Sequence, residues 1–277
     1  MPPRSGWIGL VDAGLAEDIG PGDATSAALL PPEAPGHARI EARQSLVLSG
    51  LEVARATFER LGAELEPRAG DGDRLDDGDE LARVRGPAQA ILAGERTALN
   101  FLQRLCGIAT RTREFCDAVR DAPAEIVDTR KTTPGWRSLE KYAVRCGGGG
   151  NHRLGLFDGI LIKDNHLQAV GGVAPAVERV RAQGSRHLRV RVEVETLEQA
   201  REAIEAGADA ILIDNQPPES TRAFVELAQG RVRTEASGGI RLENVAAVAA
   251  TGVDEISVGA LTHSAPAADI ALEWLER

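Results

Sequence analysis

The chain has 277 residues, 43% of them hydrophobic and 27% charged, which suits one large α/β domain or a barrel with a smaller companion. Its formal net charge of −10 argues against binding to nucleic acid or to an anionic membrane surface. No apolar run approaches the roughly 20 residues that a membrane-spanning helix needs. The three cysteines have no CxxC spacing and the N-terminus lacks a signal-peptide core, so we expect a cytoplasmic protein with reduced thiols.

The first third of the chain combines short strands with helices. Residues 7–17 have helical periodicity, and a turn-rich stretch follows at 19–36. Residues 37–50 alternate like a pair of strands, and residues 51–62 return to helical spacing. Three further short strands are expected at residues 63–68, 79–86 and 90–94. This pattern predicts a small α/β sandwich with an open sheet.

A long helical region at residues 94–121 leads into a repeating unit of apolar strand, polar loop and amphipathic helix. The six expected strands occupy residues 125–129, 158–164, 188–195, 208–215, 232–237 and 253–259. Such alternation indicates a parallel sheet joined by right-handed crossovers. Six strands are fewer than the eight of a standard barrel, so a smaller barrel and an open doubly wound sheet both fit.

We therefore predict two domains of the α/β class. The first is an N-terminal α/β sandwich at residues 1–107, and the second, at residues 108–265, is either a barrel with fewer than eight strands or an open doubly wound sheet. A C-terminal helix at residues 266–277 is expected to be able to pack on the first domain.

Charged residues and glycines stand at the ends of all six strands of the second domain. They are Asp128, Arg130, Lys131, Lys163, Asp164, Asn165, His166, Glu193, Glu195, Asp214, Asn215, Ser237, Gly238, Gly239 and Gly259. In barrels the carboxyl ends of the strands form the active-site face. The set therefore predicts one anion-handling and metal-capable pocket.

Lysine is rare in this chain and confined to one short window. Only three of the 32 Lys and Arg residues are lysines, namely Lys131, Lys141 and Lys163. Because lysine and arginine differ in shape and hydration, this distribution favours positions where a compact ammonium is needed. Chance clustering of few residues is the alternative, and a solvated helix face also explains Lys141.

The segment from Asp128 to His166 concentrates cations in an otherwise acidic protein. Arginine forks suit carboxylates, and lysines neutralise phosphates as point charges. Glu193 and Asp214 are candidate ligands for Mg²⁺ or ribose hydroxyls. The turn at residues 237–239 precedes a helix and is a natural phosphate site.

The same segments resemble the successive motifs of bacterial quinolinate phosphoribosyltransferases. The matching motifs are DTRKTTPG, EKYAVRCGGGGNHR, LIKDNH, VEVET, ILIDN, EASGGI and VGALTHS, with EDIGPGDATS and GERTALNFLQRLCGIAT nearer the N-terminus. The resemblance implies an N-terminal α/β sandwich, an α/β barrel with fewer than eight strands at residues 108–265, and a homodimer whose sites are completed by the neighbouring subunit. It also implies transfer of phosphoribosyl from phosphoribosyl pyrophosphate to quinolinate, with release of pyrophosphate and CO₂ and formation of nicotinate mononucleotide.

The resemblance also implies a role for individual residues. The two carboxylates of quinolinate would be surrounded by Arg130, Lys131, His152, Arg153 and, from the partner subunit, Arg96. Lys163 would face the reacting centre, while Glu193 and Asp214 would bind the ribose hydroxyls with Mg²⁺. The 5′-phosphate would lie among Ser237, Gly238, Gly259 and His263. The expected catalytic residues are Lys131, Lys163, Glu193 and Asp214.

Several of these residues have structural alternatives. Arg96 suits a surface position early in a helix, His152 can hydrogen-bond its own loop, and His263 can cap the last turn. Glu195 competes with Glu193 because both occupy alternate positions of one strand and share a face.

Three other functions compete with this assignment. A paralogue in molybdenum-associated metabolism should disrupt the KTTPG or IKDNH motifs, which are intact here. A nicotinate phosphoribosyltransferase would take a monocarboxylate and need fewer cationic contacts. A non-catalytic ligand sensor would be expected to lose Lys131 or the pair of Glu193 and Asp214.

Overall fold

The structure is a computed structural model that describes residues 1–184 and 187–275. The chain divides into two compact units. The first unit contains residues 1–113, 132–148 and 261–277, and the second contains residues 114–131 and 149–260. Among the described residues, no helix is both long and apolar enough to cross a membrane.

The first unit contains a four-stranded antiparallel sheet with the order β12-β1-β5-β3. The strands are β1 (Pro35–Ala42), β3 (Glu64–Pro67), β5 (Glu80–Pro87) and β12 (Ile270–Trp274). A small ladder joins β2 (Leu46–Val47) to β4 (Arg74–Leu75). The helices that lie wholly or mostly in this unit are η1 (Arg4–Gly6), α1 (Ile8–Ile19), α2 (Ala24–Leu29), α3 (Leu51–Arg60), α4 (Ala88–Ala118), α5 (Arg137–Cys146) and α11 (Ala260–His263).

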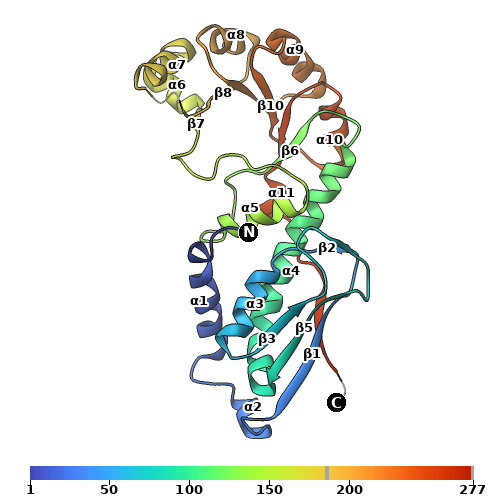
Figure 1. Cartoon of the computed structure of the whole chain (residues 1–277). Helices are drawn as coiled ribbons and strands as arrows, with labels where there is room; N and C mark the ends of the chain where they lie inside the picture. Colours follow the sequence, from blue (N-terminus) through green and yellow to red (C-terminus); the bar gives the residue numbers. More distant parts are fainter. Residues whose placement is uncertain (185–186, 276–277) are drawn as a thin grey trace. The chain divides into compact units, whose positions relative to one another are not determined.

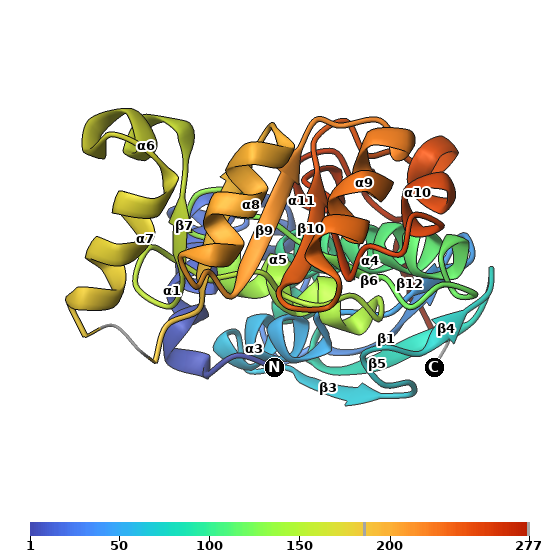
Figure 2. The same ribbon diagram turned by 90° about the horizontal axis from the view of Figure 1, so that it is seen from above.

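Helices α3 and α4 lie on the same side of this sheet (Figures 1 and 2). Phe58 of α3 and Leu102 of α4 are fully buried in one apolar cluster with Ile40 of β1 and Val84 of β5. Alternation of apolar residues along β1 and β5 turns one face of the sheet toward these helices. Burial of that face stabilises the unit.

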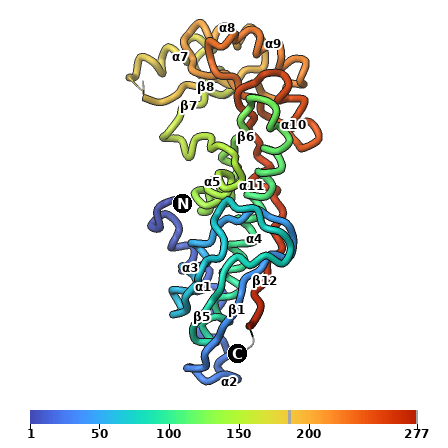
Figure 3. The backbone as a smooth tube through the Cα atoms, turned by 45° about the vertical axis from the view of Figure 1, so that its right-hand side comes forward, coloured from blue at the N-terminus to red at the C-terminus, as the bar shows by residue number. Residues whose placement is uncertain are grey.

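Two predictions for the first unit were wrong. Residues 90–94 were expected as a strand but lie inside α4, because a short apolar run does not distinguish a strand from a buried helix segment. Within the expected C-terminal helix at 266–277, residues 270–274 instead form strand β12, which pairs with β1 (Figure 3), and residues 276–277 lie outside the described residues. Ile270 and Leu272 of β12 are buried at alternate positions, so pairing and burial override the helix-forming composition of this segment.

Three smaller differences concern the same unit. The turn-rich stretch at 19–36 contains helix α2. Asp23 caps the N-terminus of this helix, because its carboxylate accepts hydrogen bonds from the backbone N–H groups of Thr25 and Ser26. Strands β1 and β2 do not pair with each other. Lys141 is buried at 3% exposure, so the alternative that placed it on a solvated helix face is wrong.

The segment 132–148 groups with the first unit, whereas the predicted domain boundary at residue 107 places it in the second. Its helix α5 packs against α4: the ring of Trp136, just before α5, stacks on that of Phe101 at 4.6 Å. In addition, Arg104 donates to the fully buried carboxylate of Glu140 at 2.8 Å. These contacts explain why the compact unit is discontinuous in sequence.

The second unit contains the six predicted strands in one parallel sheet with the order β6-β11-β10-β9-β8-β7. They are β6 (Glu125–Val127), β7 (Ile160–Ile162), β8 (Val190–Val194), β9 (Ala210–Asp214), β10 (Arg233–Ser237) and β11 (Glu255–Ser257). Strands β6 and β7 are the two edges, so this sheet is an open barrel. The predicted α/β class and the count of fewer than eight strands are confirmed.

The helices that the described residues form around this sheet are α6 (Asp164–Val170), α7 (Val173–Ala182), α8 (Leu197–Glu205), α9 (Pro218–Ala228) and α10 (Leu242–Ala249). Helices α8 and α9 run along the same face of β9 and β10 (Figure 2). Val192 of β8 and Ile211 of β9 are fully buried in the apolar cluster beneath these helices. The other face of the sheet carries the charged residues of the same strands.

Candidate functional site

A cavity of about 550 Å³ lies within the second unit, at the carboxyl ends of the parallel strands. Nine of the predicted site residues line it: Arg130, Lys131, His152, Arg153, Lys163, Glu193, Asp214, Ser237 and Gly238. Leu161 and Leu212 add apolar surface to the lining. Parallel strands bring these residues together because their carboxyl ends meet at one edge of the sheet.

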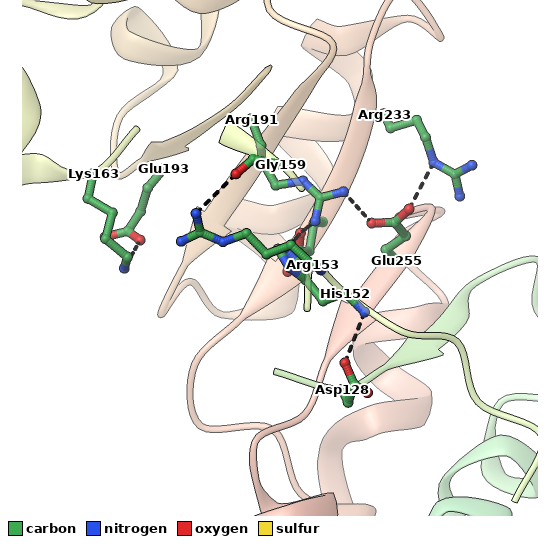
Figure 4. Close-up of polar contacts among 10 residues, drawn as sticks. Asp128, His152, Arg153, Gly159, Lys163, Arg191, Glu193, Arg233 and Glu255 are labelled. Atoms are coloured by element: carbon green, nitrogen blue, oxygen red, sulfur yellow. Dashed lines mark hydrogen bonds and ion pairs between the residues drawn. The ribbon is translucent and has the colours of Figure 1, made fainter. Parts of the chain in front are cut away.

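One side of the cavity is cationic and is built by the loops that follow β6 and precede β7. Asp128, fully buried, accepts from the backbone N–H of His152 at 2.9 Å and from Asn151 Nδ2 at 2.7 Å. Arg153 Nη1 donates to the carbonyl of Gly159 at 3.2 Å (Figure 4). These contacts hold in place the loop that carries the side chains of His152 and Arg153.

The cations on this side crowd one another. Burial lowers the pKa of Arg153, and the nearby charges of Arg130 and Arg191 lower it further. Like charges within a few ångströms disfavour each other's charged form, and arginine stays protonated in proteins despite such shifts. An anion in the cavity would relieve this repulsion.

Another part of the lining, which we call the acidic side, carries the carboxylates of Glu193 and Asp214 and contains an ion pair. Lys163 Nζ donates to Glu193 Oε2 at 2.6 Å, and the two side chains point toward each other in Figure 4. Lys163 caps the start of α6, where its backbone N–H donates to His166 Nδ1 at 2.9 Å. His166 therefore supports the end of the strand.

Asp214 ends β9 beside Ser237 of β10, with which it pairs in the sheet register. Asn215 Nδ2 donates to Asp214 Oδ2 at 3.0 Å. Glu195 lies beyond β8 and does not line the cavity, while its backbone N–H donates to Gln199 Oε1 at 2.8 Å. This geometry favours Glu193 over Glu195.

The turn after β10 needs glycine. Gly238 has a φ of +89°, and a Cβ there would lie 2.1 Å from Asn215 Oδ1. Gly238 and Gly239 line the cavity, and helix α10 begins three residues after Gly239. A glycine turn before a helix leaves backbone N–H groups accessible to an anion.

Three predicted residues are not part of this lining. Gly259 belongs to the second unit but does not border the cavity. Arg96 lies in α4 and His263 in α11, and both belong to the first unit. Their predicted roles stay predictions.

Sequence reasoning missed Arg191, Glu235 and Ser257. Glu235 and Ser257 line the cavity, and Arg191 contacts Glu235. The signal was present: in β8 and β10, charged residues alternate with apolar or small ones. That period places Arg191 and Glu193 on one face of β8.

The acidic side fits Mg²⁺ in the manner usual for phosphate-bound magnesium. Among residues 1–184 and 187–275, no group of three or more His, Cys, Asp or Glu side chains is placed to hold a metal ion. Glu193 and Asp214 nevertheless line one cavity. Mg²⁺ is commonly bound by one or two carboxylates together with substrate phosphates and water.

Two family models match the chain: the quinolinate phosphoribosyl transferase N-terminal domain over residues 23–106 and its C-terminal domain over residues 108–273. A probable nicotinate-nucleotide pyrophosphorylase (carboxylating) of Bacillus subtilis is 48% identical over 259 residues, covering 93% of this chain and 89% of that protein. The Mycobacterium leprae enzyme is 44% identical and covers 94% of each. The structure of the Francisella tularensis nicotinate-nucleotide pyrophosphorylase is 38% identical, with a TM-score of 0.96 over 99% of this chain and 98% of that one. The chain therefore belongs to the quinolinate phosphoribosyltransferase family.

Proposed function

We propose that this protein transfers phosphoribosyl from phosphoribosyl pyrophosphate to quinolinate, giving nicotinate mononucleotide, pyrophosphate and CO₂ for NAD synthesis. The observation that carries the proposal is a single cavity with a cationic side, represented by Arg130 and Arg153, and an acidic side, represented by Glu193 and Asp214. The first suits a dicarboxylate and the second suits a ribose with its leaving pyrophosphate.

The cationic side binds and orients the acceptor. Two guanidinium groups and one ammonium, those of Arg130, Arg153 and Lys131, line the same cavity. The two carboxylates of quinolinate would form charge-assisted hydrogen bonds with these cations and so reduce the repulsion among them. Fixing the dianion in this way directs its ring nitrogen toward C1′ of the ribose. Leu161 and Leu212 provide apolar surface for the ring.

The acidic side assists the breaking of the bond between C1′ of the ribose and pyrophosphate. As pyrophosphate leaves C1′, positive charge grows on the ribose, and the carboxylates of Glu193 and Asp214 stabilise it. These two residues would hold Mg²⁺, which when bound neutralises the leaving pyrophosphate. Lys163, paired with Glu193 at 2.6 Å, provides a cation on the same side. The turn at Ser237 and Gly238 would bind the 5′-phosphate.

Decarboxylation needs no separate organic cofactor. After the ring nitrogen bonds to C1′, the pyridinium is positively charged. The bond from C2 to its carboxylate then breaks, CO₂ leaves, and the electron pair remains at C2 next to that charge. Protonation at C2 gives nicotinate mononucleotide.

Product analysis tests the proposal. The full chain is incubated with Mg²⁺, phosphoribosyl pyrophosphate and quinolinate labelled with ¹³C in the 2-carboxylate. We expect one labelled CO₂ and one pyrophosphate per nicotinate mononucleotide. Absence of product, or a mononucleotide that keeps both carboxylates, would contradict the proposal. Arg153→Gln is a matched control that should weaken quinolinate binding more than binding of phosphoribosyl pyrophosphate.

We also propose a cytoplasmic homodimer in which Arg96 of each subunit reaches the partner's cavity. None of the three cysteines forms a disulfide, which supports a reducing compartment. Arg96→Ala and Lys163→Ala should each be inactive as homodimers, whereas each heterodimer should regain one intact site and up to about half of the wild-type activity. Affinity capture with two different tags establishes that heterodimers form. Captured heterodimers without activity would refute the shared site.

A further inference from the structure

A network of ion pairs around two buried carboxylates, Glu235 and Glu255, lies on the pocket face of the second unit's sheet, beneath the proposed quinolinate site. Arg191 of β8 donates to Glu235 of β10 through Nη1 and to Glu255 Oε2 of β11 through Nη2, the latter at 2.7 Å. Arg233 Nε lies 3.1 Å from Glu255 Oε1. Figure 4 shows Arg191 between the cationic loop and Glu255. The Glu235 side chain is 1% exposed and that of Arg191 12%.

Glu235 also contacts His152. His152 Nε2 lies 3.4 Å from Glu235 Oε2, the same oxygen that accepts from Arg191. Burial alone would raise the pKa of Glu235, but the hydrogen bond from His152 and the charge of Arg191 outweigh it and hold that pKa below its ordinary value. Glu235 is therefore a buried carboxylate whose partners, His152, Arg191 and Ser257, belong to different elements.

The other ring nitrogen of His152 is also engaged. The backbone N–H of Arg153 donates to His152 Nδ1 at 2.8 Å, so Nδ1 carries a lone pair and the ring proton of the neutral side chain is on Nε2. That proton faces Glu235. The backbone of His152 is held in turn by Asp128 at 2.9 Å. The ring is therefore fixed at both nitrogens and at its backbone.

A carboxylate at this place does not suit direct contact with a dianionic acceptor, which it would repel. Arg191, which donates to Glu235, instead lies near the cations of the loop. Its charge and that of Arg130 both lower the pKa of Arg153. Glu235 offsets part of this positive charge and fixes the direction of two side chains. Hydrogen bonds from residues that do not contact the ligand hold the binding residues within a fraction of an ångström of the geometry that binding requires.

We propose that Glu235 is a positioning residue for acceptor binding, which holds His152 and Arg191 in place and acts on quinolinate through them. The inference rests on the proposed function for the identity of the acceptor. Glu255 shares Arg191 but does not line the cavity, so it provides a matched control one strand away.

A double-mutant cycle on quinolinate binding tests this role. The dissociation constant is measured by calorimetry for wild type, Glu235→Gln, His152→Asn and the double variant. We expect about a 10-fold weaker binding in each single variant, as for a lost charge-assisted hydrogen bond, and nearly the same loss in the double variant. In Glu255→Gln the loss should stay below about 3-fold and should add to that of His152→Asn. Thermal unfolding of every variant establishes that it is folded.

Kinetics separate positioning from general structural support. Glu235→Gln should raise KM for quinolinate about 10-fold while KM for phosphoribosyl pyrophosphate changes less than about 2-fold. Unchanged quinolinate binding in Glu235→Gln, losses that simply add in the cycle, or equal increases in both KM values would overturn the proposal.

A readout without substrate distinguishes failure of this inference from failure of the proposed function. In ¹⁵N-histidine-labelled wild type, the His152 ring should give a protonated Nε2 whose proton exchanges slowly, and that proton should exchange faster in Glu235→Gln but not in Glu255→Gln. His152→Asn assigns the signal. If wild type fails to bind quinolinate but shows this pattern, the proposed function is wrong and the contact between Glu235 and His152 stands. If the signal is the same in Glu235→Gln, the positioning role is wrong.

Discussion

The two faces of the six-stranded sheet differ sharply although the same strands build them. Along β8, Val190, Val192 and Val194 are fully buried on the side of the helices. The intervening Arg191 and Glu193 face the cavity side. One face is therefore a hydrophobic core and the other a set of paired charges. Because successive residues of a strand face opposite sides of the sheet, a substitution on the apolar face should change stability. A substitution of the neighbouring residue, on the charged face, should change catalytic activity.

The largest effect is expected on the apolar face. Val192→Asp places a carboxylate in a fully buried site without a partner, which should lower the free energy of unfolding by about 4 kcal/mol or more. Urea denaturation measures it. If this variant does not fold, Val192→Thr provides a milder version, with an expected loss of about 1–3 kcal/mol for a buried hydroxyl. Wild-type stability in both variants would show that the two faces are not distinct.

The charged face should respond in the opposite way. Glu193→Gln should lower kcat/KM by about 100-fold because it removes a carboxylate from the acidic side, while the free energy of unfolding changes by less than about 1 kcal/mol. Glu195→Gln is the matched control, since Glu195 does not line the cavity, and should change kcat/KM less than about 3-fold. A larger loss at Glu195 would mean that the acidic side is misassigned.

Two lysines, Lys163 at the cavity and Lys141 in the core of the first unit, allow the same comparison between activity and stability within one residue type. Lys163→Arg should lower kcat/KM about 10-fold or more, because a planar fork does not replace the compact ammonium 2.6 Å from Glu193. Lys141→Arg enlarges a buried side chain of the first unit and should cost about 1–3 kcal/mol of stability. Steady-state kinetics and denaturation of both variants separate the two effects. A catalytic loss at Lys141 with none at Lys163 would reverse the assignment.

The smallest effect concerns pH. The pKa of Glu235 in the fold is below its ordinary value of 4.5, so its ionised form stabilises the fold above that pH. This contribution is lost as pH falls through the lowered folded pKa. The difference in unfolding free energy between wild type and Glu235→Gln should therefore be largest near neutral pH and shrink below about pH 4.5. A difference that grows on acidification would contradict the ion pairs.

Much of the second unit could be predicted because its strands are continuous apolar runs separated by amphipathic helices. All six strands were located, and nine of twelve site residues line one cavity since strand ends converge. The C-terminal strand β12 was missed because its partner, β1, lies more than 200 residues away in sequence. The burial of Lys141 and the pairing of Arg191 with Glu235 likewise depend on neighbours that no local pattern specifies.

The relative use of quinolinate and nicotinate tests the dicarboxylate site most directly. Nicotinate leaves part of the cationic side around Arg130 and Arg153 without an anion, which costs binding free energy in a buried site. We expect kcat/KM for phosphoribosyl transfer to quinolinate to exceed that for nicotinate by at least about 100-fold. Equal values for the two acids would contradict a cavity built for two carboxylates.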